Sequence, residues 1–136
     1  MFVLDESGSI GESDFNLTKS FLSRLVRRLD IDSGNTRVGL VTYSGYVGTV
    51  INLNAHSSVA GFQSAIASLN YSGGWTNTDV ALAYVRTTML TSAAGDRSNA
   101  SNVVVVFTDG QSTKPTATQV CIKFTKRFPS RSVSLL

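Results

Sequence analysis

Two apolar segments of the sequence each lead into an acidic residue. Residues 2–4 (FVL) run into Asp5, and residues 103–107 (VVVVF) are followed after one threonine by Asp109. Short, continuous apolar runs of this kind are typical of buried parallel strands. Ligands of open parallel sheets bind outside the carboxyl ends of the strands. We therefore expect Asp5 and Asp109 to face one crevice.

Two serines follow the first of these acids at alternate positions. Ser7 and Ser9 come after Asp5 in the pattern D-x-S-x-S, and alternate side chains of an extended segment point to the same side. Two hydroxyls, one or two carboxylates and water suit Mg²⁺, which takes oxygen ligands in near-octahedral geometry. Taken alone, the pattern also fits a turn followed by a helix cap, and Asp109 also fits a turn that ends a strand.

Enzymatic chemistry is not expected from these residues. A metal hydrolase needs an ordered water and a general base, and no candidate base stands out near the two loops. His56, the only histidine, is expected at the surface or in a loop. Cys121 has no histidine partner in a recognisable motif and is expected to be a part-buried helix residue. The sequence lacks the glycine-rich fingerprints G-x-G-x-x-G after a strand and G-x-x-x-x-G-K-[ST], which disfavours a nucleotide-binding enzyme.

Helices and strands alternate along the chain. A helix is expected from about Ser13, a suitable N-cap. Its apolar stripe is expected at Leu17, Phe21, Leu25 and Leu29, with Leu22 and Val26 beside them.

The remaining elements are expected from the spacing of their apolar residues. They are strands at 37–43, 47–53 and 132–136, helices within 59–69, 81–89 and 116–126, and a polar linker at 92–102. The fold predicted from this order is α/β: a doubly wound, Rossmann-like, mostly parallel sheet with one antiparallel edge strand and helices on both faces.

Length and composition limit the classes of protein further. The chain has 136 residues, a net charge of +3 and one cysteine, so we expect a single domain, residues 1–136, without an internal disulfide. The five basic residues of 111–136, a stretch without acids, are too dispersed to predict a nucleic-acid partner. No apolar run approaches the ~20 residues that span a bilayer, and no signal peptide is visible. We therefore expect neither nucleic-acid binding nor membrane insertion.

Four blocks of sequence carry a resemblance to a known family. "FVLDESGSIGESDF", "RVGLVTYS", "GGWTNTDVAL" and "VVVVFTDGQS" follow one another in the order and at the approximate spacing of a von Willebrand factor type A domain, of the type associated with extracellular matrix and collagen. The family's metal-ion-dependent adhesion site matches Asp5, Ser7, Ser9, Thr76 and Asp109, with Thr78 as an alternative to Thr76.

The resemblance implies an adhesion module that binds through a metal. The cation would be Mg²⁺, with Mn²⁺ or Ca²⁺ as alternatives, and a Glu or Asp of an extracellular protein such as collagen would complete its shell. A hydroxyl-rich site fits this role, because it leaves the cation only partly neutralised and open to an anionic oxygen. Two alternatives remain: a metal-independent structural module of the matrix, and an intracellular A domain that serves an ATP-driven complex.

Residues near these blocks provide further candidates. Glu6 is expected to be an exposed loop acid that could tune the charge beside the metal, and Tyr46 and Trp75 could form an aromatic rim that contacts a partner. Asn16, Asn70 and Asn99 begin N-x-S/T sequons, so a secreted glycoprotein is one reading.

The resemblance weakens toward the end of the chain. The segment "KRFPSRSVSLL" replaces the glycine-bearing fifth strand of the family. We expect a domain that is incomplete at its C-terminus: a fragment of a larger multidomain chain, a short product, or a divergent minimal domain. Missing elements would expose apolar surface, so modest stability or association with more chain is predicted.

Overall fold

A five-stranded sheet lies at the centre of the computed structural model, which describes residues 1–110, 112–118 and 131–135. The strands are β1 (Phe2–Asp5), β2 (Leu40–Tyr43), β3 (Val47–Ile51), β4 (Asn102–Phe107) and β5 (Arg131–Leu135). They follow the order β3-β2-β1-β4-β5, with β3 antiparallel to β2 and the other pairs parallel. The predicted mixed sheet with one antiparallel edge strand is confirmed.

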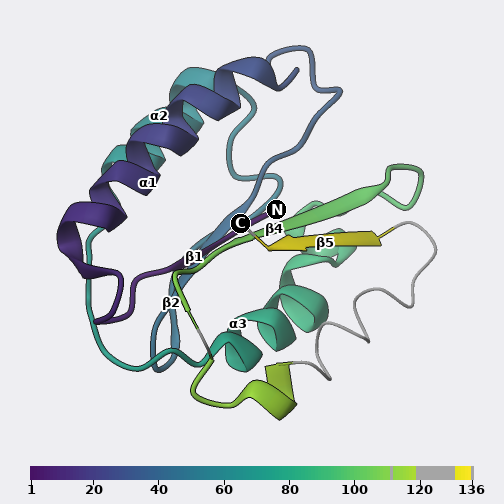
Figure 1. The fold of residues 1–136 in the computed structure, drawn as a ribbon. Helices are drawn as coiled ribbons and strands as arrows, with labels where there is room; N and C mark the ends of the chain where they lie inside the picture. Colours follow the sequence, from purple (N-terminus) through teal and green to yellow (C-terminus); the bar gives the residue numbers. More distant parts are fainter. Residues whose placement is uncertain (111, 119–130, 136) are drawn as a thin grey trace.

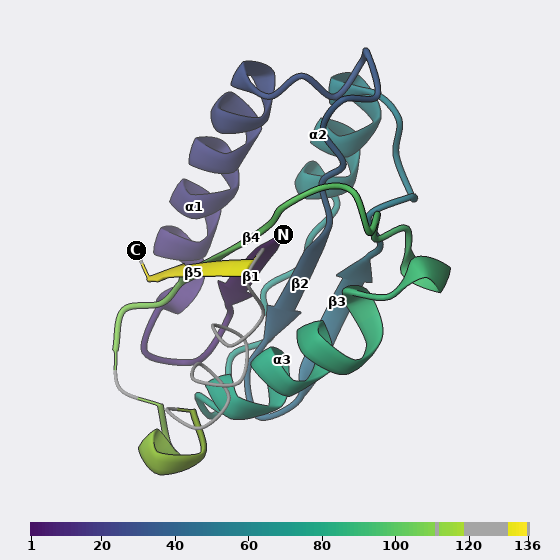
Figure 2. The same cartoon turned by 90° about the vertical axis from the view of Figure 1, so that its right-hand side faces the viewer.

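Helices cover both faces of this sheet (Figures 1 and 2). One face carries α1 (Gly11–Leu25), its 3₁₀ continuation η1 (Val26–Arg28) and α2 (Val59–Ala67); the other carries α3 (Thr78–Tyr84) and its π-helical continuation η2 (Val85–Met89). A 3₁₀ turn, η3 (Ser92–Ala94), lies within the segment predicted as a linker. The sheet therefore separates two apolar cores.

The central strand β1 explains why the cores are separate. Successive side chains of a strand point to opposite faces, so Phe2 and Leu4 join the core beneath α1 and α2, whereas Val3 joins the core beneath α3. All four residues of β1 are buried. Asp5, its last residue, is thereby fixed at the carboxyl edge of the sheet.

Helix α1 differs from its prediction in two respects. It begins at Gly11, after Ile10, so Ser13 lies in its first turn and is not the cap. The predicted stripe is wrong at Leu17 and Phe21, which are 65% and 43% exposed, whereas Leu25 and Leu29 are partly buried against the core. The buried residues of α1 and η1 are Phe15 and the two residues expected beside the stripe, Leu22 and Val26. An α-helix has 3.6 residues per turn, so a stripe of every fourth residue rotates by about 40° per step, and only part of it lies on the buried face.

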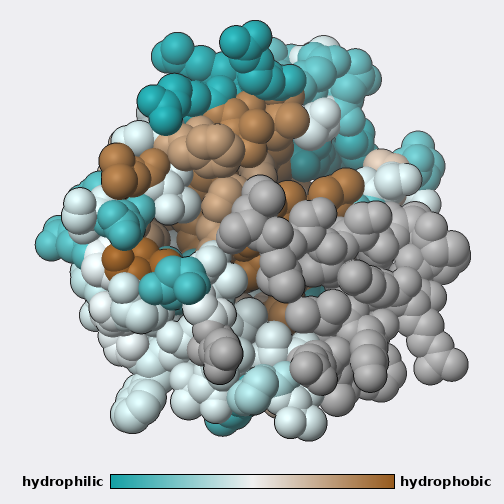
Figure 3. Space-filling view, in the orientation of Figure 1, coloured by the Kyte–Doolittle hydropathy of each residue, from teal (hydrophilic) through white to brown (hydrophobic). Residues whose placement is uncertain are grey.

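The strand segments are shorter or more exposed than predicted. Strand β2 begins three residues later than the predicted strand 37–43, and β3 ends two residues earlier than the predicted strand 47–53. In β4 only Val104 and Val106 are fully buried, and Val103 is 51% exposed on the face that carries α1, where apolar side chains gather between α1 and β4 (Figure 3). The predicted last strand is present as β5. The predicted helix 116–126 is present at residues 116–118, within a helical turn that begins at residue 115. Residues 119–126, with Cys121, lie outside the described residues.

Candidate metal centre

Asp5 is held in place by three hydrogen bonds at the end of β1. Its Oδ1 accepts the backbone N–H of Ser7 at 2.9 Å. Its Oδ2 accepts the hydroxyls of Thr108 at 2.7 Å and Tyr43 at 3.3 Å. The side chain is 3% exposed. Asp5 therefore lies behind the surface, with its orientation fixed by three different segments of the chain.

The two serines and the second acid meet in front of Asp5. The hydroxyl oxygens of Ser7 and Ser9 are 3.1 Å apart, and the hydroxyl of Ser9 donates to Asp109 Oδ1 at 3.1 Å. Neighbouring oxygens around an octahedral Mg²⁺ are about 3 Å apart, given metal–oxygen distances of ~2.1 Å. The spacing of the three oxygens thus fits such an ion. The loops after β1 and β4 face one crevice, as the sequence predicts.

The members of this group differ in their exposure to solvent. Ser7 is fully buried, whereas Ser9 and Asp109 are exposed. Within the described residues there is no group of three or more His, Cys, Asp or Glu side chains that could hold a metal. The donor set contains two carboxylates and otherwise neutral hydroxyls. Two carboxylates balance the formal charge of a divalent cation, and the hydroxyls add no negative charge, so a further anionic oxygen can still replace a water in its shell.

The glycine-rich loop, residues 72–77, lies against the serine loop. Gly8 N–H donates to the Gly74 carbonyl at 2.9 Å, and the Tyr71 hydroxyl donates to the Ser7 carbonyl at 3.1 Å. The Thr76 backbone is fixed by Thr113, whose Oγ1 accepts the Thr76 N–H at 3.2 Å. These bonds position the loop that carries Thr76 beside Ser7.

Thr78, the alternative to Thr76, is buried and hydrogen-bonded to Tyr43. It is 3% exposed, and its hydroxyl shares a hydrogen bond of 3.2 Å with the Tyr43 hydroxyl. Thr78 therefore supports Asp5 through Tyr43, whereas Thr76 is partly exposed. This difference favours Thr76 as the ligand candidate of the two.

Glu6 is buried, which corrects the expectation of an exposed loop acid. The side chain is 3% exposed. Burial raises the pKa of Glu6, and the charge of Asp5 raises it further, while hydrogen bonds from Ser72 and Thr42 lower it. A Cβ at Gly48 would overlap both Glu6 Oε1 and Thr42 Oγ1. Glu6 therefore occupies a space that a glycine on β3 leaves for it.

Sequence reasoning missed the residues that support Asp5, above all Tyr43. Burial, followed by the charge of Asp5, raises the pKa of the Tyr43 hydroxyl, so it remains a neutral donor. Tyr43 and Asp5 are register partners at the ends of β2 and β1. A polar residue that ends the neighbouring parallel strand is the signal that could have identified it.

Tyr46 and Trp75 are exposed on neighbouring loops, as predicted for a rim. Their exposed fractions are 68% and 73%. Asn77 joins the loops, since its side-chain N–H donates to the Gly45 carbonyl at 2.8 Å and its backbone N–H donates to the Ser44 carbonyl at 2.9 Å. The two aromatic side chains thus project from one connected surface beside the glycine-rich loop.

The other candidate residues lie away from the centre. His56 is half-buried and packs edge-on against Phe62, with ring centroids 6.1 Å apart. Asn70 and Asn99 are exposed in loops, and Asn16 is exposed on α1. Among the described residues, no helix combines the length and apolar character needed to cross a membrane.

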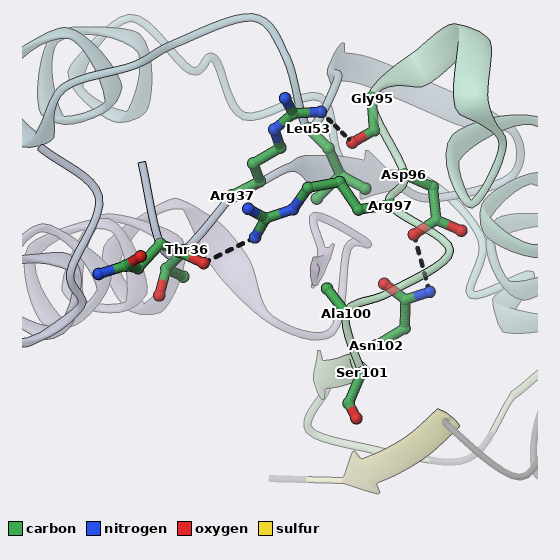
Figure 4. Close-up of a pocket in the computed structure, with 10 residues that line it drawn as sticks. Thr36, Arg37, Leu53, Gly95, Asp96, Arg97, Ala100, Ser101 and Asn102 are labelled. Carbon is green, nitrogen blue, oxygen red and sulfur yellow. Dashed lines mark hydrogen bonds between the residues drawn. The ribbon is translucent and has the colours of Figure 1, made fainter. Parts of the chain in front are cut away.

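The opposite end of the sheet holds a polar cavity of about 250 Å³ (Figure 4). Arg37 donates to the Gly95 carbonyl at 2.8 Å. Arg97 donates to the carbonyls of Gly34 at 3.0 Å and Asn35 at 2.6 Å. Both guanidinium groups thus bond to backbone carbonyls and fasten neighbouring loops to each other.

Comparisons with known proteins agree with this fold and sequence pattern. The chain is 39% identical over 112 residues to human collagen alpha-1(XX) chain and 40% identical over 111 residues to integrin alpha-2 of Bos taurus. These matches cover 82% and 81% of the chain but 9% of each relative, so the chain spans a small part of their length.

A solved structure shows the same fold. Proximal thread matrix protein 1 from the mussel byssus, described with a zinc-occupied MIDAS motif, superposes with a TM-score of 0.88 at 24% identity. The superposition covers 98% of this chain and 36% of the other. The model of the von Willebrand factor type A domain matches residues 1–127. The chain belongs to the von Willebrand factor type A domain family.

Proposed function

We propose that the chain is an adhesion module that binds a protein ligand through a divalent cation at Asp5, Ser7, Ser9, Thr76 and Asp109. The observation that carries this proposal is the convergence of the Ser7, Ser9 and Asp109 oxygens at spacings of 3.1 Å. These oxygens come from loops about 100 residues apart in the sequence. The donor set of hydroxyls and carboxylates favours a hard cation, and we propose Mg²⁺, with Mn²⁺ or Ca²⁺ as alternatives.

The partner supplies a carboxylate in this proposal. Only two carboxylates are available to the cation, so an anionic oxygen of a partner does not have to compete with a full shell of acids, and the exposure of Ser9 and Asp109 leaves the cation within reach. A Glu or Asp of an extracellular protein such as collagen provides that oxygen. Tyr46 and Trp75 supply apolar contact area for the same partner, because exposed aromatic residues are common binding anchors.

The relatives support an extracellular role. One is a collagen chain, one is an integrin subunit, and the structural neighbour is a matrix protein whose MIDAS motif is occupied by zinc. We propose that this chain is secreted as part of a larger multidomain protein, with glycans at Asn70, Asn99 or Asn16. We also propose that it is not an enzyme, because no candidate general base stands out in the sequence near the two loops.

Titration of the purified chain with Mn²⁺ and Mg²⁺ by calorimetry tests the metal site. The decisive variant is Asp109→Asn, and the matched control is Asp32→Asn, which removes the same charge but keeps an oxygen for the Val59 N–H that Asp32 accepts at 2.9 Å. We expect Asp109→Asn to weaken cation binding by more than about tenfold and the control to leave it unchanged. A folded wild-type chain that binds neither cation would refute the proposal.

Binding to immobilised collagen, in Mg²⁺ and in EDTA, tests the ligand. We expect binding in Mg²⁺ that EDTA and Asp109→Asn abolish. Binding that survives both changes would instead support the metal-independent structural module. A chain that binds cations but not collagen would refute collagen as the ligand and leave the metal site intact.

A further inference from the structure

A chain of hydrogen bonds runs from the start of α3 to Asp5. The Tyr43 hydroxyl donates to Asp5 Oδ2 at 3.3 Å, and it shares a second bond, of 3.2 Å, with the Thr78 hydroxyl. A phenol carries a single hydrogen. Because Tyr43 gives that hydrogen to Asp5, Thr78 must be the donor in the second bond. The chain therefore has one direction, from Thr78 through Tyr43 to the carboxylate.

Every member of this chain is shielded from solvent. Tyr43 is fully buried in the core beneath α3, and Asp5 and Thr78 are each 3% exposed. A hydrogen bond lost at such a position leaves a polar group without a partner, and linked hydrogen bonds strengthen one another where water is absent. The placement of each of the three side chains therefore depends on the other two.

The chain connects two candidate ligands of the cation. Asp5 ends β1, whereas Thr78 is the first residue of α3 and follows Thr76 by two residues. Tyr43 ends β2, the strand beside β1. Its hydroxyl bonds to the carboxylate on one side and to the helix that follows the glycine-rich loop on the other. The position of this loop relative to Asp5 therefore depends on one buried hydroxyl.

We propose that Tyr43 is a positioning residue of the metal centre, whose hydroxyl sets the placement of the Thr76 loop relative to Asp5. The inference rests on the proposed function. It gives Thr78 an indirect effect on cation binding, through Tyr43 and not through the metal. Removal of a side chain that orients a metal ligand commonly lowers metal affinity by about 10- to 100-fold. A site made largely of neutral hydroxyls depends on such placement, because its ligands supply little charge.

Calorimetric titration with Mn²⁺ tests the hydroxyl of Tyr43 alone. Tyr43→Phe removes one oxygen from a ring that remains in the core, and we expect it to weaken Mn²⁺ binding by about tenfold. Tyr84→Phe is the matched control, because Tyr84 packs against the same core but lies at the far end of α3. We expect this control to bind Mn²⁺ as the wild type does. Circular dichroism checks that both variants fold.

A double-mutant cycle distinguishes an indirect effect of Thr78 from direct coordination. Thr78→Val keeps the shape of the side chain but removes its hydroxyl, and we expect Mn²⁺ binding about threefold weaker. In the Tyr43→Phe protein the same change is expected to have no further effect, because the chain is already broken. Thr78→Ser keeps a hydroxyl, so we expect it to bind Mn²⁺ more tightly than Thr78→Val. A purely structural role of Tyr43 would change stability without this pattern of affinities.

The hydrogen bonds themselves are tested without metal on the same proteins. In urea denaturation in EDTA, we expect the double variant to lose less free energy of unfolding than the sum of the two single variants. Additive losses would show that Tyr43 and Thr78 do not depend on each other, and the proposal would fall.

Two affinity results would also overturn the proposal. One is a Tyr43→Phe protein that binds Mn²⁺ as tightly as the wild type. The other is a Thr78→Val change that weakens binding equally with and without the Tyr43 hydroxyl, since Thr78 would then be a direct ligand. Both results leave cation binding, and with it the proposed function, intact. A folded wild type that binds no cation would refute both.

Discussion

The two ends of the sheet both carry charged side chains, yet they use them differently. At the carboxyl end, the oxygens of Ser7, Ser9 and Asp109 contact one another. At the opposite end, Arg37 and Arg97 donate to backbone carbonyls of Gly95, Gly34 and Asn35. The first set of bonds joins side chains that a cation can bridge in place of a proton. The second set closes loops that would otherwise come apart.

The comparison shows how a binding site differs from a structural contact. Side-chain oxygens that share hydrogen bonds near the surface, as Ser9 does when it donates to Asp109, lose little when an ion replaces those bonds. A backbone carbonyl that loses its arginine must find water or remain unsatisfied. We therefore expect substitutions at the carboxyl end to change affinity, and substitutions at the other end to change stability.

The largest expected effect is the loss of cation binding in Asp5→Asn. An asparagine keeps the shape of Asp5 and an oxygen for the Ser7 N–H, and the hydroxyls of Tyr43 and Thr108 can rotate to accept from its amide. The fold should therefore survive, while the loss of one of two carboxylates should weaken Mn²⁺ affinity by more than about 100-fold. Calorimetry measures the affinity, and a thermal melt in EDTA checks the fold. Wild-type affinity in this variant would remove Asp5 from the site.

A pair of glycine substitutions separates stability from affinity. Gly95 has φ of +93°, and a Cβ there would lie 2.6 Å from the Asn54 backbone nitrogen. A Cβ at Gly48 would overlap the side chains of Glu6 and Thr42. We expect either change to alanine to lower the free energy of unfolding by about 2–3 kcal/mol, through strain and overpacking.

Of the two variants, Gly48→Ala is expected to weaken cation binding as well. The added methyl group pushes on Glu6, which lies between the candidate ligands Asp5 and Ser7 in the sequence. Urea denaturation in EDTA and Mn²⁺ titration of the folded proteins measure the two quantities. Equal cation affinities of the two alanine variants would contradict the link between Gly48 and the metal centre.

The arginines at the far end provide a smaller effect on stability alone. Arg37→Met keeps most of the apolar stem but leaves the carbonyl of the buried Gly95 without its donor, at an expected cost of about 1–2 kcal/mol. Arg97→Met should cost less than about 1 kcal/mol, because its two bonds are exposed and water can replace them. Urea denaturation measures both. A change in Mn²⁺ affinity in either variant would contradict the assignment of this end to stability.

The sequence predicted the mostly parallel sheet with one antiparallel edge strand and the placement of the two acids. Residues 2–4 and 103–107 are short, continuous apolar runs followed by turn residues, a pattern typical of buried parallel strands. The sheet then brings Asp5 and Asp109 to one edge, because parallel strands end on the same side. Prediction succeeded here because a local run of apolar residues identifies a parallel strand, and the direction of that strand places the acid that follows it.

Prediction failed where burial depends on the neighbouring element. The side of α1 that packs is set by β1 and α2, so the stripe of every fourth residue is exposed at Leu17 and Phe21 and reaches the core only toward the end of the helix. Glu6 looked like a loop acid because nothing near it in the sequence shows that Gly48, on a different strand, leaves room for it. Tyr43 was read as part of a strand, and its bond to Asp5 arises from strand register alone.

Glu6→Gln provides the smallest effect and tests the environment of the metal centre directly. Burial raises the pKa of Glu6, and the nearby charge of Asp5 acts in the same direction. The folded state therefore holds the Glu6 proton more tightly than the unfolded state does. The contribution of Glu6 to stability is greatest below the ordinary pKa of glutamate and declines as pH rises through the raised pKa.

A glutamine at this position is neutral at every pH, so it lacks this decline. We expect the free energy of unfolding of Glu6→Gln, relative to the wild type, to become more favourable between pH 4 and pH 7 in EDTA. Urea denaturation at several pH values measures the difference, and Glu12→Gln, at an exposed acid of α1, is the matched control. A relative stability that falls with rising pH would mean that the hydrogen bonds from Ser72 and Thr42 stabilise the carboxylate more than burial disfavours it. The carboxyl end of the sheet would then hold a second buried negative charge beside Asp5, and its attraction for cations would be correspondingly greater.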